Sequence, residues 1–314
     1  MVPFERSGDR LDQVLVELFP DYSRSRLQTW VKSGEITVDG ALRKPRDKML
    51  GGETVRLVVP EPEPDPMQAQ PVPLNIVYED DALLVIDKPI GLVVHPAAGN
   101  PDGTLMNGLL HHAPELAAVP RAGIVHRLDK DTSGLLVVAR TLAAHKNLVE
   151  QLQERTVSRE YLAVVNGTLV AGGTVDEPID RHPVDRKRMA VRHNGREAIT
   201  HFRVDERFRA HTALRVKLET GRTHQIRVHM AHLKHPLVGD PVYGGRLRTP
   251  PDSSPEFIEA LRRFPRQALH AVALGLVHPL TGEECRWESP IPDDIQALLA
   301  AMRVDRDTHE TSAS

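Results

Sequence analysis

The chain opens with apolar residues at helical spacing. They recur at intervals of three and four, at Leu11, Val14, Leu15, Leu18, Leu27, Trp30 and Val31. Pro20 ends the first predicted helix, Ser23 is a suitable N-cap for the second, and Gly34 can terminate that helix. Apolar and polar residues then alternate over 36–38 and 55–59, which predicts short strands. The first 59 residues are therefore predicted to form a small helix-helix-strand module.

Six prolines interrupt the pattern over residues 60–73 and favour an extended linker. A larger domain is predicted over residues 74–302. It contains apolar runs typical of buried strands at 83–86 and 158–167, and a helical pattern near 144–152. We expect its last helix to span about 293–302 and to be followed by a polar, disordered tail over 303–314.

The densest group of ionisable residues lies between two apolar runs, 124–125 and 135–139. Both runs are short and rich in β-branched residues, so we expect buried strands. The loop between them carries His126, Arg127, Asp129, Lys130 and Asp131. Loops held by a rigid scaffold often carry chemistry, although a charged hairpin turn in water is the simpler alternative.

Two further residues stand out in predicted strands. Ile226 and Val228 flank Arg227, which would place Arg227 on the opposite face of a strand, towards a cleft. A solvent-facing arginine is the alternative. Tyr161 lies within the run 158–167, and a strand tyrosine is more often a packing residue than a functional one.

Net charge gives no indication of nucleic-acid binding, because the 314 residues carry a formal charge of −3. Any RNA contact must therefore come from local clusters. One cluster lies within sixteen residues, is opposed only by Asp185, and contains Arg181, Arg186, Lys187, Arg188, Arg192 and Arg196. Another lies on or beside the second predicted helix, at Arg24, Arg26 and Lys32. Each is a candidate phosphate-binding surface or simply a solvated face.

Several chemistries have no support in the sequence. The single cysteine, Cys285, excludes an internal disulfide and a cysteine-based zinc site, and no HExxH motif occurs, so we expect no metal. No glycine-rich phosphate loop is present, so we expect no nucleotide cofactor. No apolar run approaches the roughly 20 residues of a membrane span, and the first ten residues lack a secretory signal. These features favour a cytoplasmic protein without a membrane partner.

Residues 126–134, His-Arg-Leu-Asp-Lys-Asp-Thr-Ser-Gly, closely resemble the active-site motif of the RluA-type pseudouridine synthases. Residues 158–167 and 218–229 resemble the second and third motifs of that family, in the family's order. The resemblance implies an α+β fold, in which a mixed, largely antiparallel sheet is flanked by helices and crossed by the active-site cleft. Residues 23–40 resemble a small RNA-binding module first described in a ribosomal small-subunit protein.

The resemblance also implies roles for individual residues. Asp129 would be the nucleophile, attacking either the ribose anomeric carbon or the uracil ring, and Asp131 is its rival within the loop. Arg227 would keep Asp129 ionised and oriented. Tyr161 would stack on the base and is a candidate for removing the proton from the ring carbon. Arg127 would fill the gap left by a flipped uridine.

The implied activity is the isomerisation of uridine to pseudouridine in RNA. No cofactor is expected, because the reaction involves no redox step and no outside energy. The order of the two domains most resembles the subgroup that modifies large-subunit (23S) ribosomal RNA. Transfer RNA is an alternative substrate, and a non-catalytic RNA-binding ribosome-assembly factor is an alternative function. We expect a monomer, and the sequence does not identify the modified uridine.

Overall fold

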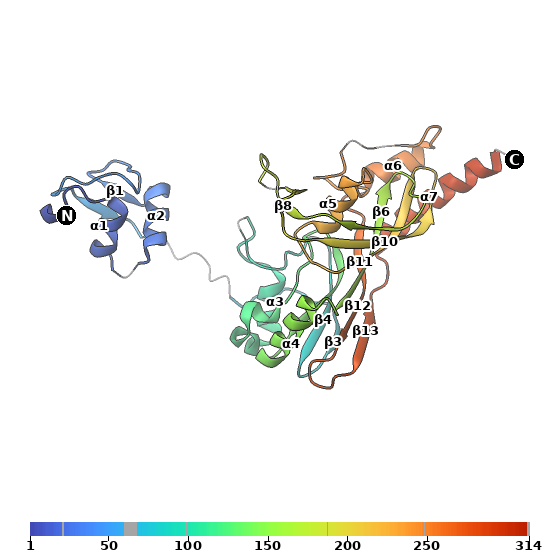
Figure 1. Cartoon of the computed structure of the whole chain (residues 1–314), viewed down its shortest axis with the longest axis horizontal. Coiled ribbons are helices and arrows are strands. Elements are labelled where there is room, and N and C mark those ends of the chain that lie inside the picture. Colours follow the sequence, from blue (N-terminus) through green and yellow to red (C-terminus); the bar gives the residue numbers. More distant parts are fainter. Residues whose placement is uncertain are drawn as a thin grey trace. The chain divides into compact units, whose positions relative to one another are not determined.

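The computed structural model describes residues 1–20, 22–59, 68–97, 99–186, 188–245, 247 and 249–312. The chain divides into two compact units, residues 1–65 and residues 66–314, which we name the small unit and the large unit (Figure 1). Residues 60–67 of the predicted linker lie outside the described residues. The two units are considered separately below.

Two helices and a two-stranded antiparallel sheet form the small unit. A 3-10 turn at Phe4–Arg6 precedes α1 (Leu11–Leu18), α2 (Arg24–Ser33), β1 (Ile36–Val38) and β2 (Val55–Leu57). The Ser23 side chain accepts a hydrogen bond from the Arg26 N–H and caps α2, while Gly34 ends that helix in the left-handed conformation. Apolar residues of both helices and both strands share one core. The predicted helix-helix-strand order is confirmed.

A nine-stranded sheet forms the centre of the large unit. Its strands are β3 (Ile76–Glu79), β4 (Leu83–Lys88), β5 (Ser133–Ala139), β6 (Ser158–Asn166), β7 (Gly173–Asp176), β10 (Ile199–Arg207), β11 (His211–Leu218), β12 (Leu269–Val277) and β13 (Glu284–Glu288). Their order is β3-β4-β5-β12-β6-β11-β10-β7, and β13 pairs with β12. Among these strands β5 and β12 pair in parallel and the other pairs are antiparallel. The expected mixed, largely antiparallel sheet is confirmed.

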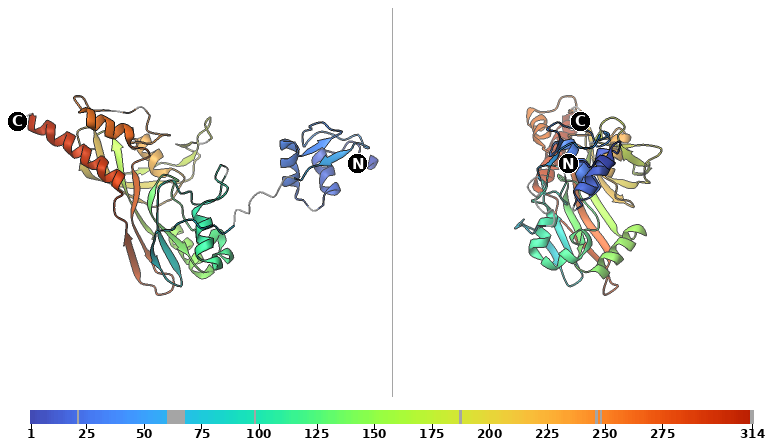
Figure 2. Two further views of the ribbon diagram at one scale, coloured as in Figure 1. Left: turned by 180° about the vertical axis from the view of Figure 1, so that it is seen from behind. Right: turned by 90° about the vertical axis from the view of Figure 1, so that its left-hand side faces the viewer.

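The helices of the described part of the large unit are α3 (Leu105–His112), α4 (Leu142–Gln153), α5 (Gln225–His232), α6 (Pro255–Arg263) and α7 (Asp293–Ser312). Figures 1 and 2 show α6 and α7 side by side at one end of the sheet, with α3 and α4 towards the other end. Two 3-10 turns, Pro114–Ala118 and Pro120–Gly123, follow α3. A separate ribbon of β8 (Ile179–Arg181) and β9 (Met189–Val191) contacts α5 through β9.

Strand β6 contributes to two parts of the core. Tyr161 and Ala163 belong to a cluster that includes residues of α3 and α5, whereas Leu162 and Val164 belong to one that includes residues of α6 and α7. Alternation between two buried faces is typical of a central strand covered on both sides. Arg159 has the same parity as Tyr161, so the two side chains lie on one face of β6.

The apolar run before the charged loop is not a strand, contrary to our expectation. Ile124 forms only an isolated bridge with Val138, and the continuous strand begins after the loop, at Ser133. The preceding 3-10 turn ends at Gly123, where φ is +79° and a Cβ atom would lie 1.9 Å from the Ala139 carbonyl oxygen. The chain therefore turns tightly against β5, and too few residues remain for strand pairing before the loop.

Arg227 lies on a helix, so the strand predicted around it was wrong. Helix α5 begins at Gln225, and Ile226 and Met230 pack in one core cluster with i,i+4 spacing. Val228 packs in a different cluster. Two alternating apolar residues are too short a pattern to separate a strand from a helix.

The last helix continues beyond its predicted end at residue 302. Helix α7 reaches Ser312, so most of the expected polar tail is helical. Ion pairs join this added part of the helix to other elements. Polar residues can pack in this way where opposite charges meet. Asp305 pairs with Arg209 at 2.9 Å, and Glu206 of β10 pairs with Arg303 and Arg306.

The second part of the predicted linker is attached to the large unit. The Asn107 side-chain amide, on α3, donates to the Gln68 carbonyl at 2.7 Å. The Gly103 N–H donates to Gln70 Oε1, also at 2.7 Å. Residues 68–73 therefore form part of the large unit and do not act as a connection between the two units.

Candidate active site

One cavity of the large unit brings together the residues that the family resemblance indicated. The cavity has a volume of about 930 Å³, and its lining includes Arg127, Asp129, Tyr161 and Arg227. Asp129 reaches it from the loop before β5, Tyr161 from β6 and Arg227 from α5. The rival carboxylate, Asp131, is not among the described residues that line the cavity.

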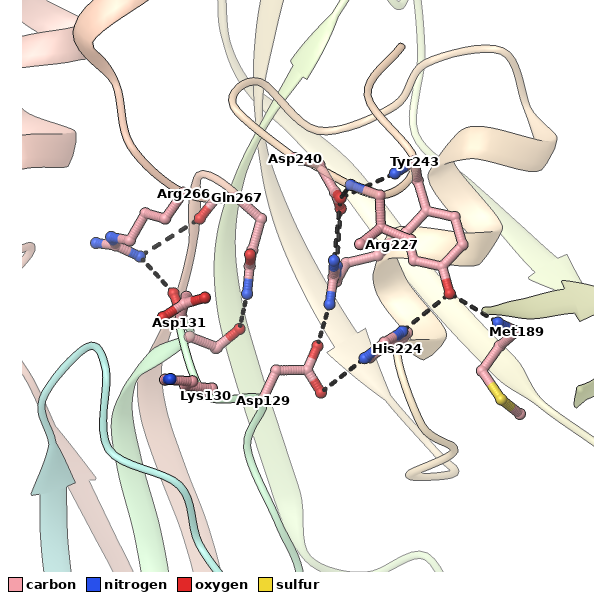
Figure 3. A network of polar contacts seen from close by, with 12 residues as sticks. Asp129, Lys130, Asp131, Met189, His224, Arg227, Asp240, Tyr243, Arg266 and Gln267 are labelled. Carbon is pink, nitrogen blue, oxygen red and sulfur yellow. Dashed lines mark hydrogen bonds and ion pairs between the residues drawn. The ribbon is translucent and has the colours of Figure 1, made fainter. Parts of the chain in front are cut away.

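Arg227 holds the Asp129 carboxylate from one side (Figure 3). Its Nη1 donates to Asp129 Oδ2 at 3.0 Å. Its Nε and Nη2 donate to the two carboxylate oxygens of Asp240 at 2.7 and 3.0 Å, in the fork geometry of a bidentate pair. Arg227 is 4% exposed and the Asp240 side chain is fully buried, so this network is shielded from solvent.

These contacts fix the charges in the network. Burial opposes the charged form of Arg227, but Asp240 and Asp129 more than offset it and raise the pKa of Arg227 above its ordinary value. Burial would raise the pKa of Asp240, yet Arg227 and two backbone N–H donors lower it. Both groups are therefore charged at neutral pH, and a second carboxylate orients the guanidinium that contacts Asp129.

His224 approaches Asp129 from another side. Its Nε2 lies 3.9 Å from Asp129 Oδ1, and its Nδ1 lies 2.9 Å from Tyr243 Oη (Figure 3). The tyrosine hydroxyl also accepts a hydrogen bond from the Met189 N–H at 2.9 Å. Burial lowers the pKa of His224, so the imidazole is neutral at neutral pH. We infer that Tyr243 donates to Nδ1, which leaves the imidazole proton on Nε2, facing Asp129.

Buried cations hold the backbone of the charged loop. Lys88 is fully buried, and its Nζ donates to three backbone carbonyls, including that of Lys130 at 2.9 Å. Burial lowers the pKa of Lys88 to about 8. Arg266 Nη1 donates to the next carbonyl, that of Asp131, at 3.3 Å (Figure 3). These contacts position Asp129 through its backbone neighbours.

The other expected residues face the cavity in different ways. Tyr161 is 5% exposed, and burial raises the pKa of its hydroxyl, which is therefore protonated at neutral pH. Arg127 is exposed at the rim. Next to it, His126 Nε2 accepts a hydrogen bond from the Val137 N–H at 3.1 Å, and burial lowers the pKa of His126 to about 3. His126 is thus a neutral acceptor that fixes the start of the loop.

Of the basic cluster predicted between residues 181 and 196, Arg196 lines this cavity, whereas Arg186, Arg188 and Arg192 lie outside its lining. Arg186 and Arg192 are exposed. The Arg188 guanidinium lies 5.3 Å from the centre of the Tyr243 ring, which ties the ribbon to the Asp129 network. Lys187 lies outside the described residues.

The three basic residues predicted on the small unit differ in their contacts. Arg24 pairs with the buried carboxylate of Asp12 at 2.9 Å. Arg26 lies 6.0 Å from the Trp30 ring centre, and Lys32 is exposed. Arg24 is therefore partly engaged in a structural ion pair, whereas Arg26 and Lys32 present their charges on the surface of α2.

Three members of the network were not predicted as site residues: Asp240, His224 and Tyr243. A local signal for Asp240 exists, because it follows an apolar run and its Oδ1 accepts hydrogen bonds from two N–H groups of its own turn. Asp240 pairs with Arg227, thirteen residues earlier, and this separation follows neither the helical nor the strand period. The local pattern around Asp240 is therefore that of a turn, but it does not identify the turn's partner.

The described part of the chain contains no group of three or more histidine, cysteine, aspartate or glutamate side chains arranged to hold a metal ion. Among its described helices, none is both long enough and apolar enough to cross a membrane. Cys285 lies in β13 as a free thiol.

Comparisons with known proteins assign this chain to a family. A family model described as RNA pseudouridylate synthase matches residues 82–232, and one described as S4 domain matches residues 9–55. The chain is 61% identical to ribosomal large subunit pseudouridine synthase D of Xanthomonas campestris, covering 97% of this chain and 92% of that one. It is 60% identical to the protein of the same name from Pseudomonas aeruginosa, covering 98% and 96%. The chain belongs to the RNA pseudouridylate synthase family and is an RNA pseudouridine synthase.

Solved structures agree with this assignment. Human RNA pseudouridylate synthase domain containing 4 aligns with a TM-score of 0.58 at 26% identity, covering 73% of this chain and 93% of that one. Human RNA pseudouridylate synthase domain containing 1 aligns with a TM-score of 0.56 at 28% identity, covering 74% and 89%. The family, fold class and enzyme class expected from the sequence are confirmed.

Proposed function

We propose that this enzyme isomerises uridines of large-subunit ribosomal RNA, with Asp129 as the nucleophile. One observation carries the chemistry: the Asp129 carboxylate, 15% exposed, lines the cavity and is held by Arg227 at 3.0 Å. The substrate assignment rests on the relatives named ribosomal large subunit pseudouridine synthase D, which match almost the whole chain.

The reaction rearranges one nucleotide without consuming another reactant. The N1–C1′ bond breaks, the C5–C1′ bond forms, C5 loses a proton and N1 gains one, so atoms and electrons balance. Asp129 attacks either the ribose anomeric carbon or the uracil ring, and it is released unchanged at the end. A carboxylate partly removed from water and oriented in advance is a better nucleophile than one in solution.

The neighbouring residues support this step. Arg227, itself oriented by Asp240, holds the Asp129 carboxylate in position within the cavity. Tyr161 stacks on the flipped base; because its pKa is raised, it is a poor base at neutral pH, so we assign it stacking rather than proton removal. Arg127, exposed at the rim, occupies the gap that the flipped uridine leaves. Base flipping costs a few kcal/mol, least at an unpaired base.

We assign RNA binding outside the cavity to two groups of basic residues. Those around the β8–β9 ribbon are Arg186, Lys187, Arg188 and Arg192, and those on α2 are Arg24, Arg26 and Lys32. The corresponding organisation is an RNA-binding module within residues 1–59 and a catalytic domain that includes residues 68–73 ahead of the predicted start at 74. The enzyme acts as a monomer in the cytoplasm, on ribosomal RNA during or after assembly.

A pseudouridine map of total RNA tests the proposal. The gene is deleted in the source organism, and the strain is complemented with wild type, Asp129→Asn or Asp131→Asn. We expect wild type and Asp131→Asn to restore specific large-subunit ribosomal RNA sites, and Asp129→Asn to restore none. Asp131→Asn is the matched control, because it makes the same change in the same loop outside the cavity lining.

Other outcomes separate the parts of the proposal. If the pseudouridines lost from the deletion strain lie in transfer RNA, the substrate assignment is wrong but the proposed reaction stands. If Asp129→Asn restores the pseudouridines, Asp129 is not the nucleophile. If Asp131→Asn alone fails to restore them, Asp131 is the nucleophile. If no pseudouridine depends on the protein, the non-catalytic RNA-binding alternative replaces the proposal.

A further inference from the structure

Arg159 is a buried cation that has no carboxylate partner in the part of the chain that the structure describes. It is 6% exposed and lines the active-site cavity from β6. Among the described residues it makes one hydrogen bond, from Nη2 to the Glu219 carbonyl at 3.0 Å. Its Nε is buried without a partner among those residues. A guanidinium has five N–H donors, so most of the hydrogen-bonding capacity of Arg159 is unused.

The nearby carboxylates are occupied by other groups. The Glu219 side chain pairs with Arg155 at 2.7 Å and with His201 at 2.6 Å. Glu197, which also lines the cavity, pairs with Arg155 at 2.6 Å. Arg155 therefore holds two carboxylates, whereas the one hydrogen bond of Arg159 within the described ranges goes to the Glu219 backbone carbonyl.

A buried charge without a counter-ion is expensive, because it loses hydration and gains no ion pair. Burial lowers the pKa of Arg159 below its ordinary value, yet an arginine remains protonated at neutral pH. This part of the cavity therefore carries an uncompensated positive charge. The polyanionic substrate of the family can supply the missing charge.

We propose that Arg159 binds a phosphate of the substrate RNA inside the active-site cavity. The inference rests on the proposed function, because it takes RNA as the occupant. Arg159 is two residues from Tyr161 on the same face of β6, roughly 7 Å along the strand. A base stacked on Tyr161 would thus bring its own or an adjacent phosphate within reach of Arg159. Arg155 and Arg227, which pair with carboxylates, line the same cavity. So do four more arginines, which suit a polyanion: Arg121, Arg127, Arg196 and Arg222.

Gly221 leaves room for the guanidinium. A Cβ atom at position 221 would lie 2.8 Å from Arg159 Nη1, closer than such contacts allow. Substituting alanine there would displace the Arg159 guanidinium without removing its charge. Gly221→Ala is therefore a second variant that tests position separately from charge.

Equilibrium binding at several salt concentrations tests the proposal in the full-length protein. The probe is an unmodified transcript of large-subunit ribosomal RNA. We expect Arg159→Gln to lower affinity at least tenfold at low salt and to reduce the slope of log K against log salt by about 0.7, the value for one single-strand phosphate contact. We expect Gly221→Ala to lower affinity to a smaller extent. The single-turnover rate at saturating RNA should change much less than affinity does.

Arg286→Gln is the matched control. Arg286 is a partly exposed arginine on β13 that pairs with Glu160, whose side chain lies on the face of β6 opposite Arg159. Affinity and salt slope of this variant should equal those of wild type. Circular dichroism checks that each variant is folded.

An unchanged salt slope in Arg159→Gln would overturn the inference. So would a large loss of single-turnover rate at unchanged affinity, which would place Arg159 on the uracil ring rather than on a phosphate. If the wild type binds the transcript but modifies none of its uridines, the proposed function fails. In that case the slope of log K against log salt, compared between wild type and Arg159→Gln, still shows whether Arg159 binds a phosphate.

Discussion

Two buried arginines line one cavity and are held in opposite ways. Arg227 donates to two carboxylates, those of Asp129 and Asp240, whereas Arg159 donates to one carbonyl. The protein therefore neutralises one cation itself and leaves the other without a counter-ion among the described residues. On our proposals the contrast means that the cavity has two functions: one side orients the Asp129 carboxylate in advance, and the other receives charge from the substrate.

The largest effect should follow from breaking the Arg227 network. Arg227→Met removes the partner of Asp240, whose carboxylate is fully buried, and the free energy of unfolding should fall by about 3–5 kcal/mol. Activity should also be lost, because Asp129 loses its nearest donor. Urea denaturation measures the first effect, and single-turnover conversion of RNA measures the second.

The double variant Arg227→Met with Asp240→Asn is the control for that interpretation. It removes both charges of the buried pair, so it should regain a substantial part of the stability lost in Arg227→Met. It should remain inactive. If stability does not recover, the loss came from packing around Arg227 rather than from an unpaired Asp240.

A pH effect should appear on the Arg159 side of the cavity. Burial, with a smaller contribution from Arg159, lowers the pKa of His126 to about 3, against about 6.5 in the unfolded chain. Between these values the unfolded chain binds more protons, so stability falls as the pH is lowered through this window. His126 alone should cost about 1 kcal/mol between pH 6 and pH 5.

His126→Gln tests this expectation, because a glutamine oxygen can accept the Val137 N–H but cannot titrate. Urea denaturation at pH 7, 6 and 5 should give a flatter dependence of stability on pH than in wild type. Parallel curves for the two proteins would show that His126 does not titrate on unfolding as described.

Tyr243→Phe should give a smaller effect on the Asp129 side. The substitution removes the hydroxyl that joins Met189 to His224 but keeps the ring beside Arg227. We expect the single-turnover rate to fall roughly tenfold, or about 1.4 kcal/mol, at unchanged RNA affinity. Tyr78→Phe is the control, because that hydroxyl binds Asp80 outside the cavity lining. Equal rates for Tyr243→Phe and wild type would remove His224 and Tyr243 from the positioning network.

The sequence predicted the residues of the site better than their structural setting. Asp129, Tyr161 and Arg227 were named from contiguous motifs, and one cavity contains all three. Arg227 was nevertheless placed on a strand, because two flanking apolar residues do not distinguish period two from period 3.6. Local patterns report which residues face inward, but the element type here depends on packing with Met230, one turn further on.

Partners distant in sequence were the part that could not be predicted. The Arg227–Asp240 pair spans thirteen residues, and the hydrogen bond from Arg159 to Glu219 spans sixty. Both contacts depend on how β6, β11 and α5 meet, which no periodicity encodes. The basic cluster between residues 181 and 196 was conspicuous in the sequence, whereas Arg159, alone between Ser158 and Glu160, was not. Its significance comes from burial without a carboxylate, and only the folded chain reveals that.

The smallest effect on stability should come from Arg159, and it distinguishes the two arginines most directly. Arg159→Met replaces an unpaired buried cation with an apolar side chain of similar length, so the free energy of unfolding should stay within about 1 kcal/mol of wild type or rise. Urea denaturation of Arg159→Met and Arg227→Met in parallel measures how much each substitution changes the free energy of unfolding. A loss as large as that of Arg227→Met would mean that the protein itself stabilises the Arg159 charge. In that case no anion from RNA is needed there, and the two sides of the cavity are electrostatically alike.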